Sequence, residues 1–152
     1  MSKESRKKAM YLLQKQDRTE FQLRDKLKQN GFGEADIEDA INYVKDFHYL
    51  DDERFAQNYI RYGSENKSRQ KLKLALLQKG VSSDIIDIAL EEEYNGNELE
   101  QIRYLLSKKS FSPENTTPEE RQKIISSLYR KGFRIDDIKV AMGKMEDFLL
   151  DD

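Results

Sequence analysis

Apolar residues return in one register at three places along the chain, each time around a glycine. These glycines are Gly31, Gly80 and Gly132, which lie 49 and 52 residues apart. Positions −8, −4, +1, +6, +9 and +10 from each glycine are apolar in all three copies: Leu23, Leu27, Phe32, Ile37, Ala40 and Ile41; Leu72, Leu76, Val81, Ile86, Ala89 and Leu90; and Ile124, Leu128, Phe133, Ile138, Ala141 and Met142. Repetition at this period predicts one helical unit that is used three times.

Each copy shows the 3.6-residue periodicity of amphipathic helices, so the predicted fold is all-α. We expect three tandem three-helix repeats over residues 1–49, 50–96 and 97–152. The predicted helices cover residues 3–16, 19–30 and 34–47; 52–65, 68–79 and 83–94; and 98–109, 118–131 and 135–149. Repeats joined in series predict an elongated helical array, straight or curved.

Helix-end signals support these boundaries. Thr19 stands three residues before Gln22 and Thr117 stands three residues before Glu120, which is the spacing of a capping box. Pro118 suits the first position of the helix that Thr117 opens. Each repeat glycine follows a helix at the point where a left-handed residue is needed, and glycine adopts that conformation without a Cβ penalty. A long loop is expected over residues 110–117.

Charged residues make up 37% of the chain and the net charge is −2, but the two signs are separated. Basic side chains precede each glycine and acidic ones follow it: residues 61–80 carry six basic and one acidic side chain, whereas residues 84–100 carry none and seven. The chain has no cysteine, and no apolar stretch approaches the ~18 residues of a membrane span. We expect a soluble, cytoplasmic protein that does not contact membranes.

Residues that could support catalysis are scarce. The one histidine, His48, lies at a predicted helix end, where histidine packs or caps more often than it catalyses. Asp51 and Asp52 are explained by a helix start, where the dipole favours negative charge. The glycine and distal glutamate of a calcium loop are missing, and so is a glycine-rich phosphate loop. The sequence predicts a protein that is not an enzyme and uses no cofactor, no metal and no small-molecule substrate.

Two helices joined through a glycine turn are also typical of helix–turn–helix DNA readers. In this chain, however, the helices that follow the glycines are acidic, as Glu38, Asp87 and Asp136 illustrate. Duplex DNA carries one negative charge per ~1.7 Å of its axis, and each acid placed in a groove would be repelled by roughly 1 kcal/mol. Base reading by these helices is disfavoured.

The helices that precede the glycines are basic and form the candidate partner- and DNA-binding surface. The candidate residues are Lys67, Arg69, Lys71 and Lys73, with Arg61 and Lys79 beside them, and, as a second choice, Arg18, Arg24, Lys26 and Lys28 of the first repeat. Such charges also occur on helix faces that are merely solvated, and this alternative stays open. Because only Glu65 offsets the six cations of residues 61–80, we expect weak, salt-sensitive and sequence-independent DNA binding.

The middle helix of the second repeat differs from its counterparts. Leu72 and Leu76 fall on its core face, but Leu74 and Leu77 fall on the opposite side. A helix that is apolar nearly all round is usually buried. Two interpretations stay open: this second face contacts a neighbouring repeat, or it contacts a partner protein.

A longer motif suggests a family. The run Leu50-Asp51-Asp52-Glu53-Arg54-Phe55-Ala56, followed by Tyr59-Ile60, resembles the RecX family of recombinase regulators, with support from residues 17–20, 23–27, 31–32 and 77–81. The resemblance covers about residues 9–94. One departure is His48, where the family pattern suggests a small residue such as glycine.

The resemblance implies a modular all-helical protein that binds the RecA recombinase filament on DNA and inhibits its ATPase and strand exchange, and so modulates recombination and repair. The expected partners are this filament and, weakly, DNA. The alternative is a helical-repeat scaffold or a general nucleic-acid-binding protein without recombinase specificity. Most of the motif is explained by structure, since Asp51 suits a helix start and Phe55 and Tyr59 share a face.

Overall fold

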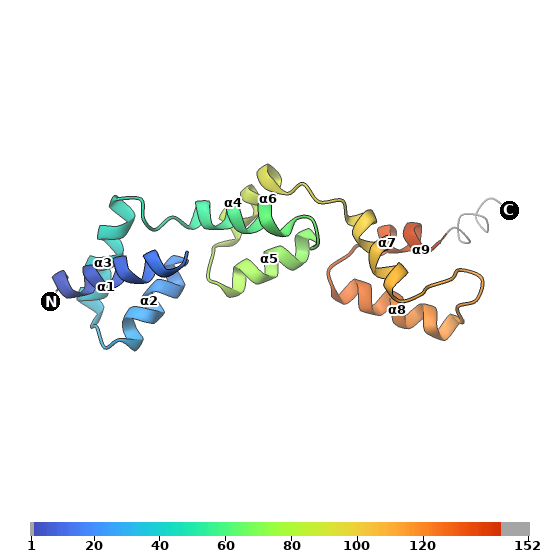
Figure 1. Cartoon of the computed structure of the whole chain (residues 1–152), viewed down its shortest axis with the longest axis horizontal. Coiled ribbons are helices and arrows are strands. Elements are labelled where there is room, and N and C mark those ends of the chain that lie inside the picture. Colours follow the sequence, from blue (N-terminus) through green and yellow to red (C-terminus); the bar gives the residue numbers. More distant parts are fainter. Residues whose placement is uncertain (1, 144–152) are drawn as a thin grey trace. The chain divides into compact units, whose positions relative to one another are not determined.

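The computed structural model describes residues 2–143, which contain nine α-helices and no strand. The helices of the first repeat are α1 (Ser2–Lys15), α2 (Glu20–Gln29) and α3 (Glu34–Asp46); those of the second are α4 (Asp52–Gly63), α5 (Arg69–Gln78) and α6 (Ser83–Glu93); those of the third are α7 (Glu98–Lys108), α8 (Pro118–Arg130) and α9 (Ile135–Met142). Figure 1 shows them in chain order. The all-α prediction is confirmed, and the predicted end of the last helix, residue 149, lies outside the described residues.

The predicted helix ends are also observed. Thr19 Oγ1 accepts the Gln22 N–H at 3.1 Å, and Gln22 Oε1 accepts the Thr19 N–H at 3.1 Å, which completes the capping box. Thr117 and Glu120 form the same box at the start of α8. Gly31, Gly80 and Gly132 have φ angles of 89°, 90° and 96°, so all three occupy the left-handed region that the sequence required.

The backbone conformation at position 48 explains why the family pattern suggests glycine where this chain has His48. Its φ is 61°, a left-handed conformation that non-glycine residues adopt infrequently. The His48 N–H donates to the Lys45 carbonyl at 3.0 Å, so the residue ends α3. The side chain is exposed, and therefore His48 closes the helix without packing in the core.

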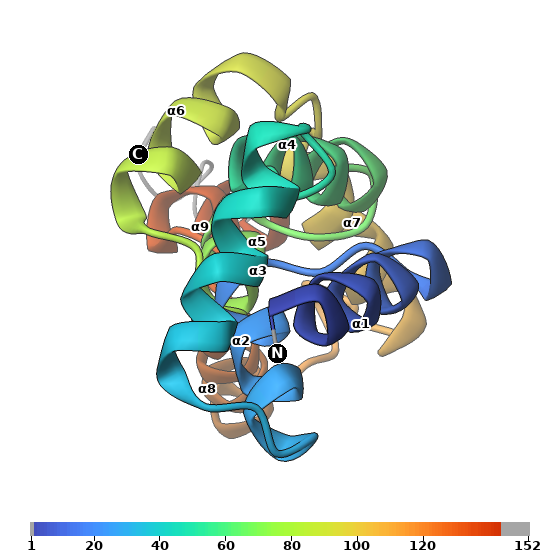
Figure 2. The ribbon, with the colours of Figure 1, turned by 90° about the vertical axis from the view of Figure 1, so that its left-hand side faces the viewer.

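The chain folds as two compact units. One holds the residues up to Ile60 together with Lys73–Glu93, and the other holds Arg61–Leu72 together with the residues from Tyr94 onward. In the first unit α1 packs against α3, and α2 contacts both (Figure 2). In the second unit α7 and α8 both pack against α9.

Each unit has a core built from the register positions of the sequence pattern. The first core contains Ala9, Leu12, Leu23, Leu27, Ile37, Ala40, Ile41, Val44 and Leu50. The core of the second unit contains Ile102, Leu106, Leu128, Phe133, Ile138 and Met142. The register positions of the second repeat, from Leu72 to Leu90, are buried as well.

Candidate partner and nucleic-acid interface

The principal basic cluster lies at the start of α5. Ser68 is the buried residue before the helix, and its Oγ accepts the Lys71 N–H at 3.1 Å as a helix cap does. Lys67 precedes Ser68, and Arg69 is the first helical residue. The cap therefore sets where the chain turns into the helix and places Lys67, Arg69 and Lys71 around one helix end.

Tyr94, near the end of the second repeat, and Glu98 of the third repeat hold this helix end. The Tyr94 hydroxyl donates to the Lys67 carbonyl at 2.8 Å, and the Arg69 guanidinium lies 4.8 Å from the centre of the Tyr94 ring. The Arg69 N–H donates to Glu98 Oε2 at 2.8 Å. Burial raises the pKa of Tyr94, which keeps its hydroxyl a donor. These two hydrogen bonds therefore fix the backbone at Lys67 and Arg69, from which both basic side chains extend.

Some of the basic and acidic side chains that the sequence separates form ion pairs with each other inside a repeat. Arg24 lies seven residues before Gly31 and pairs with Glu38, seven residues after it, at 2.8 Å. The same positions of the second repeat hold Lys73 and Asp87, which pair at 2.7 Å. The acidic third helix therefore neutralises a basic middle-helix residue in both repeats, a pairing that the shared register could have revealed.

The remaining candidates have varied surroundings. Arg18 Nε donates to the Leu12 carbonyl at 3.3 Å, and Lys79 lies 5.5 Å from the centre of the Tyr59 ring. Arg61 is exposed at the end of α4, Lys26 is half-buried and Lys28 is exposed. Lys71 is exposed, and its ammonium makes no ion pair with a described residue. Of the principal cluster, Lys71 is therefore the cation most accessible to a partner.

One contact between successive repeats occurs twice. In the first joint, made by Thr19, Glu20, Asp52 and Lys79, the Thr19 hydroxyl donates to the Lys79 carbonyl at 2.5 Å and the Glu20 N–H donates to Asp52 Oδ1 at 2.9 Å. In the second joint, made by Ser68, Arg69, Glu98 and Lys131, the Ser68 hydroxyl donates to the Lys131 carbonyl at 2.9 Å and the Arg69 N–H donates to Glu98. Each joint places the start of one middle helix against the end of the next, which sequence reasoning missed.

The repeat glycines take part in these joints. A Cβ at Gly80 would overlap Phe21, and a Cβ at Gly132 would lie 2.7 Å from Gln70 Cβ. Phe21 and Gln70 occupy the same helical position, two residues after the capping hydroxyl. Nothing lies within 4 Å of the corresponding point at Gly31, since the end of α2 takes part in neither joint. Gly80 and Gly132 therefore serve close packing as well as helix termination.

The carboxylates at the first joint have shifted pKa values. Burial raises the pKa of Asp52, although the Glu20 N–H partly offsets this. Burial alone would raise the pKa of Glu20 too, but its hydrogen bonds with Lys45 and Arg24 lower it below the ordinary value. The pKa values of the two acids in the first joint are therefore shifted in opposite directions.

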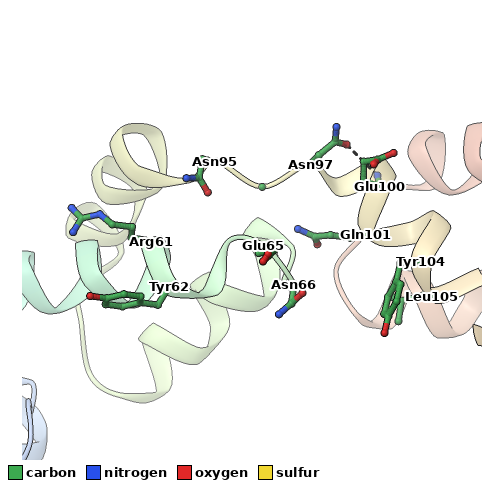
Figure 3. Close-up of a pocket in the computed structure, with 11 residues that line it drawn as sticks. Arg61, Tyr62, Glu65, Asn66, Asn95, Asn97, Glu100, Gln101, Tyr104 and Leu105 are labelled. Carbon is green, nitrogen blue, oxygen red and sulfur yellow. Dashed lines mark hydrogen bonds between the residues drawn. The ribbon is translucent and has the colours of Figure 1, made fainter.

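A groove of about 930 Å³ lies in the second unit, and we call it the tyrosine groove. Its lining includes Tyr62 and Glu65 on one side and Glu100, Gln101 and Tyr104 of α7 on the other (Figure 3). Gln101 Nε2 donates to the Ser64 carbonyl at 2.8 Å and lies 3.2 Å from the Tyr94 hydroxyl. No sequence pattern indicates this groove, because its walls come from separate repeats.

Leu74 and Leu77 expose 49% and 41% of their area, so the second apolar face of α5 is not buried in the structure. Contact with a partner protein stays a prediction for this face.

Metal-ligand clusters and membrane-spanning helices are both absent from the part of the chain that the structure describes. No group of three or more histidine, aspartate or glutamate side chains among them is arranged to hold a metal ion. Within residues 2–143, no helix has both the length and the apolar character of a membrane span.

Family models match all three repeats of the chain. The first three-helix domain of RecX matches residues 6–43, the second matches residues 51–90 and the third matches residues 97–142. This chain belongs to the RecX family. The resemblance read from residues 9–94 is confirmed and extends to the third repeat. RecX proteins are regulatory and non-enzymatic, which agrees with the prediction made from the residues.

Curated RecX proteins resemble the chain over most of its length. The regulatory protein RecX of Caldanaerobacter subterraneus subsp. tengcongensis is 36% identical over 143 residues, which cover 93% of this chain and 70% of that protein. The regulatory protein RecX of Vibrio campbellii is 35% identical over 143 residues, covering 91% of this chain and 89% of that protein.

Solved RecX structures share the fold. The crystal structure of RecX from Lactobacillus salivarius matches with a TM-score of 0.76 at 24% identity, over 95% of this chain and 96% of that one. A second crystal structure of regulatory protein RecX matches with a TM-score of 0.78 at 23% identity, over 92% and 70% of the two chains. Three tandem three-helix domains are therefore the architecture of this RecX chain.

Proposed function

We propose that the chain binds the RecA recombinase filament on DNA and inhibits its ATPase and strand exchange. The observation that carries this proposal is the basic cluster at the start of α5, held in place by Tyr94 and Glu98 in a member of the RecX family. A filament presents both protein and phosphate, and a basic helix end suits the phosphate. DNA contact of this kind is weak and independent of sequence.

The structure changes which candidate cations we expect to matter most. Lys73 and Arg24 are already paired with Asp87 and Glu38, so their charges are partly neutralised. Lys71 is exposed without an ion pair to a described residue, and Lys67 and Arg69 share its helix end. We assign the main phosphate contacts to Lys67, Arg69 and Lys71.

The decisive experiment measures DNA-dependent ATP hydrolysis by the recombinase with this protein below stoichiometric amounts. Loss of hydrolysis supports the proposal. Unchanged hydrolysis at several-fold excess, together with measurable DNA binding, would favour the alternative of a general nucleic-acid-binding protein or scaffold.

The assignment of residues has its own test. Lys71→Glu should weaken inhibition about 5–10-fold and make the salt dependence of single-strand binding shallower by about 0.7 in log–log slope, since one phosphate contact is lost. Lys139→Glu is the matched control, because Lys139 is exposed on α9 and lies outside the cluster. Equal behaviour of the two variants would refute the assignment but not the function.

The elongated helical array stays a prediction, and small-angle scattering of the free protein can test it.

A further inference from the structure

The tyrosine groove is not used by the proposed phosphate contacts, and its chemistry differs from that of the basic cluster. Two carboxylates, Glu65 and Glu100, line it against one cation, Arg61. Figure 3 shows the Arg61 guanidinium directed away from Gln101, whereas Glu65 lies on the side that Gln101 faces. Arg103 lies 3.5 Å from Glu100 but is one turn along the same helix and exposed. Among the residues that line the groove, carboxylates therefore outnumber cations by two to one, which disfavours a phosphate backbone.

The aromatic residues of the groove are unusually accessible. Tyr62 exposes 83% of its area and Tyr104 exposes 60%. Tyrosine is enriched at the centres of protein interfaces because its ring buries a large area with little loss of conformational entropy. The Tyr104 ring already has the Lys108 ammonium 5.4 Å from its centre, so this ring accepts a cation.

Gln101 adds a directional preference. The residue is buried, and its Nε2 is engaged by the Ser64 carbonyl and the Tyr94 hydroxyl. These contacts fix the amide so that Oε1 is its free end, and no described residue donates to Oε1. A buried acceptor without a donor is unfavourable. Gln101 therefore leaves one unsatisfied hydrogen-bond acceptor at the wall of the groove.

We propose that the tyrosine groove receives a lysine or arginine side chain of a partner protein. Such a side chain carries positive charge for Glu65 and Glu100, an aliphatic stem for Tyr104, and N–H donors for Gln101. Phosphate offers the opposite charge and only acceptors. This inference rests on the proposed function in one respect, since the partner protein is taken to be the recombinase. The two surfaces of the second unit then have different tasks: the start of α5 contacts DNA, and the groove contacts protein.

Charge reversal tests the groove with a matched control. The double variant Glu65→Lys/Glu100→Lys raises the net charge by four, and so does Glu91→Lys/Glu92→Lys on the exposed side of α6, outside the groove. Any general gain in DNA attraction is equal in the two variants. We expect the groove variant to need about tenfold more protein for half-inhibition of the recombinase ATPase, whereas the control changes less than about twofold. Equal inhibition by both variants would overturn the proposal.

A second measurement does not depend on the recombinase. A tetra-arginine peptide should shift the side-chain amide signals of Gln101 in the wild-type nuclear magnetic resonance spectrum and not in Glu65→Lys/Glu100→Lys. If single-stranded oligothymidine shifts these signals instead, the groove takes nucleic acid and the proposal is wrong. If the peptide shifts Gln101 but the chain does not inhibit the recombinase, the proposed function fails and the groove chemistry stands. If the chain inhibits and the peptide leaves Gln101 unchanged, the groove chemistry fails alone.

Discussion

The first and second joints make the same contacts with different side chains. A threonine hydroxyl reaches the Lys79 carbonyl in the first, and a serine hydroxyl reaches the Lys131 carbonyl in the second. The amide that opens the middle helix donates to Asp52 in one case and to Glu98 in the other. The difference shows that a joint needs a hydroxyl and a carboxylate of either length, because both act on backbone groups that the helix ends leave free.

The surroundings of the two joints differ more than the joints themselves. Glu20 of the first joint also pairs with Lys45 at 3.1 Å and with Arg24 at 2.9 Å, so charges reinforce it. The second joint is reinforced by the Tyr94 hydroxyl and Gln101, which are neutral. We therefore expect salt and pH to act mainly on the first joint, and loss of the Tyr94 hydroxyl to act on the second joint alone.

The largest effect is expected from alanine at a joint glycine. Gly80→Ala adds overlap with Phe21 to the strain of a left-handed alanine, and should cost about 2–5 kcal/mol of unfolding free energy. Gly31→Ala carries the same strain in open space and should cost only about 1–2 kcal/mol. Urea unfolding measures both. Equal losses would show that helix termination, not packing of the joint, explains the glycines.

A smaller effect is expected from the joint hydroxyl. Thr19→Ala removes a helix cap, about 0.5–2 kcal/mol, and also leaves the Lys79 carbonyl unpaired, about 1–3 kcal/mol. Thr117 has the same capping box but is exposed, so Thr117→Ala should lose only the cap. Thr19→Ser should recover most of the loss. A Thr117 variant as damaging as the Thr19 variant would contradict the joint as we describe it.

The parts of this fold that the sequence predicted are those with local signals. Thr19 and Gln22, or Gly31 and the helix before it, lie within one or two turns of each other, so spacing alone identifies them. The second partner of the Thr19 hydroxyl is Lys79, which is 60 residues away. No local pattern distinguishes a cap that also joins repeats from one that does not, and the joints were therefore missed.

The candidate site was predictable to a different degree. The basic middle helices follow from composition, but the sequence-based interpretation considered only partners and solvent for their charge, and no pairing within a repeat. Arg24 with Glu38 and Lys73 with Asp87 share one register around their glycines, and that regularity was available in the sequence. The tyrosine groove was not predictable, because Tyr62 and Tyr104 come from different repeats and nothing in their spacing relates them.

A hydroxyl deletion sharpens the contrast between the neutral and the charged joint. Tyr94→Phe keeps the ring beneath Arg69 but removes the donor to the Lys67 carbonyl, and should cost about 1–2 kcal/mol. Hydrogen exchange should become faster at the Arg69 amide and stay unchanged at the Glu20 amide. Tyr104→Phe, on an exposed ring, is the control and should change neither. Faster exchange at both amides would mean that the two joints do not respond separately.

The smallest effect concerns the charge of Asp52. Because burial raises its pKa, the folded state binds this proton more tightly than the unfolded state, and stability falls as pH rises from the ordinary aspartate value through the raised one. Asp52→Asn keeps an oxygen for the Glu20 N–H without the charge, so at pH 7 it should be neutral or stabilising by less than about 1 kcal/mol, since the site is half exposed. Glu20 acts in the opposite sense: its pKa is lowered, so its contribution to stability is present above the ordinary glutamate pKa and is lost as pH falls through the lowered pKa.

Unfolding free energy measured from pH 3 to pH 8 tests both groups. Asp52→Asn should remove the fall in stability on the alkaline side of the aspartate range and keep the loss of stability in acid, which comes from Glu20. A clear destabilisation of Asp52→Asn at pH 7 would mean that the carboxylate charge itself holds the first joint together.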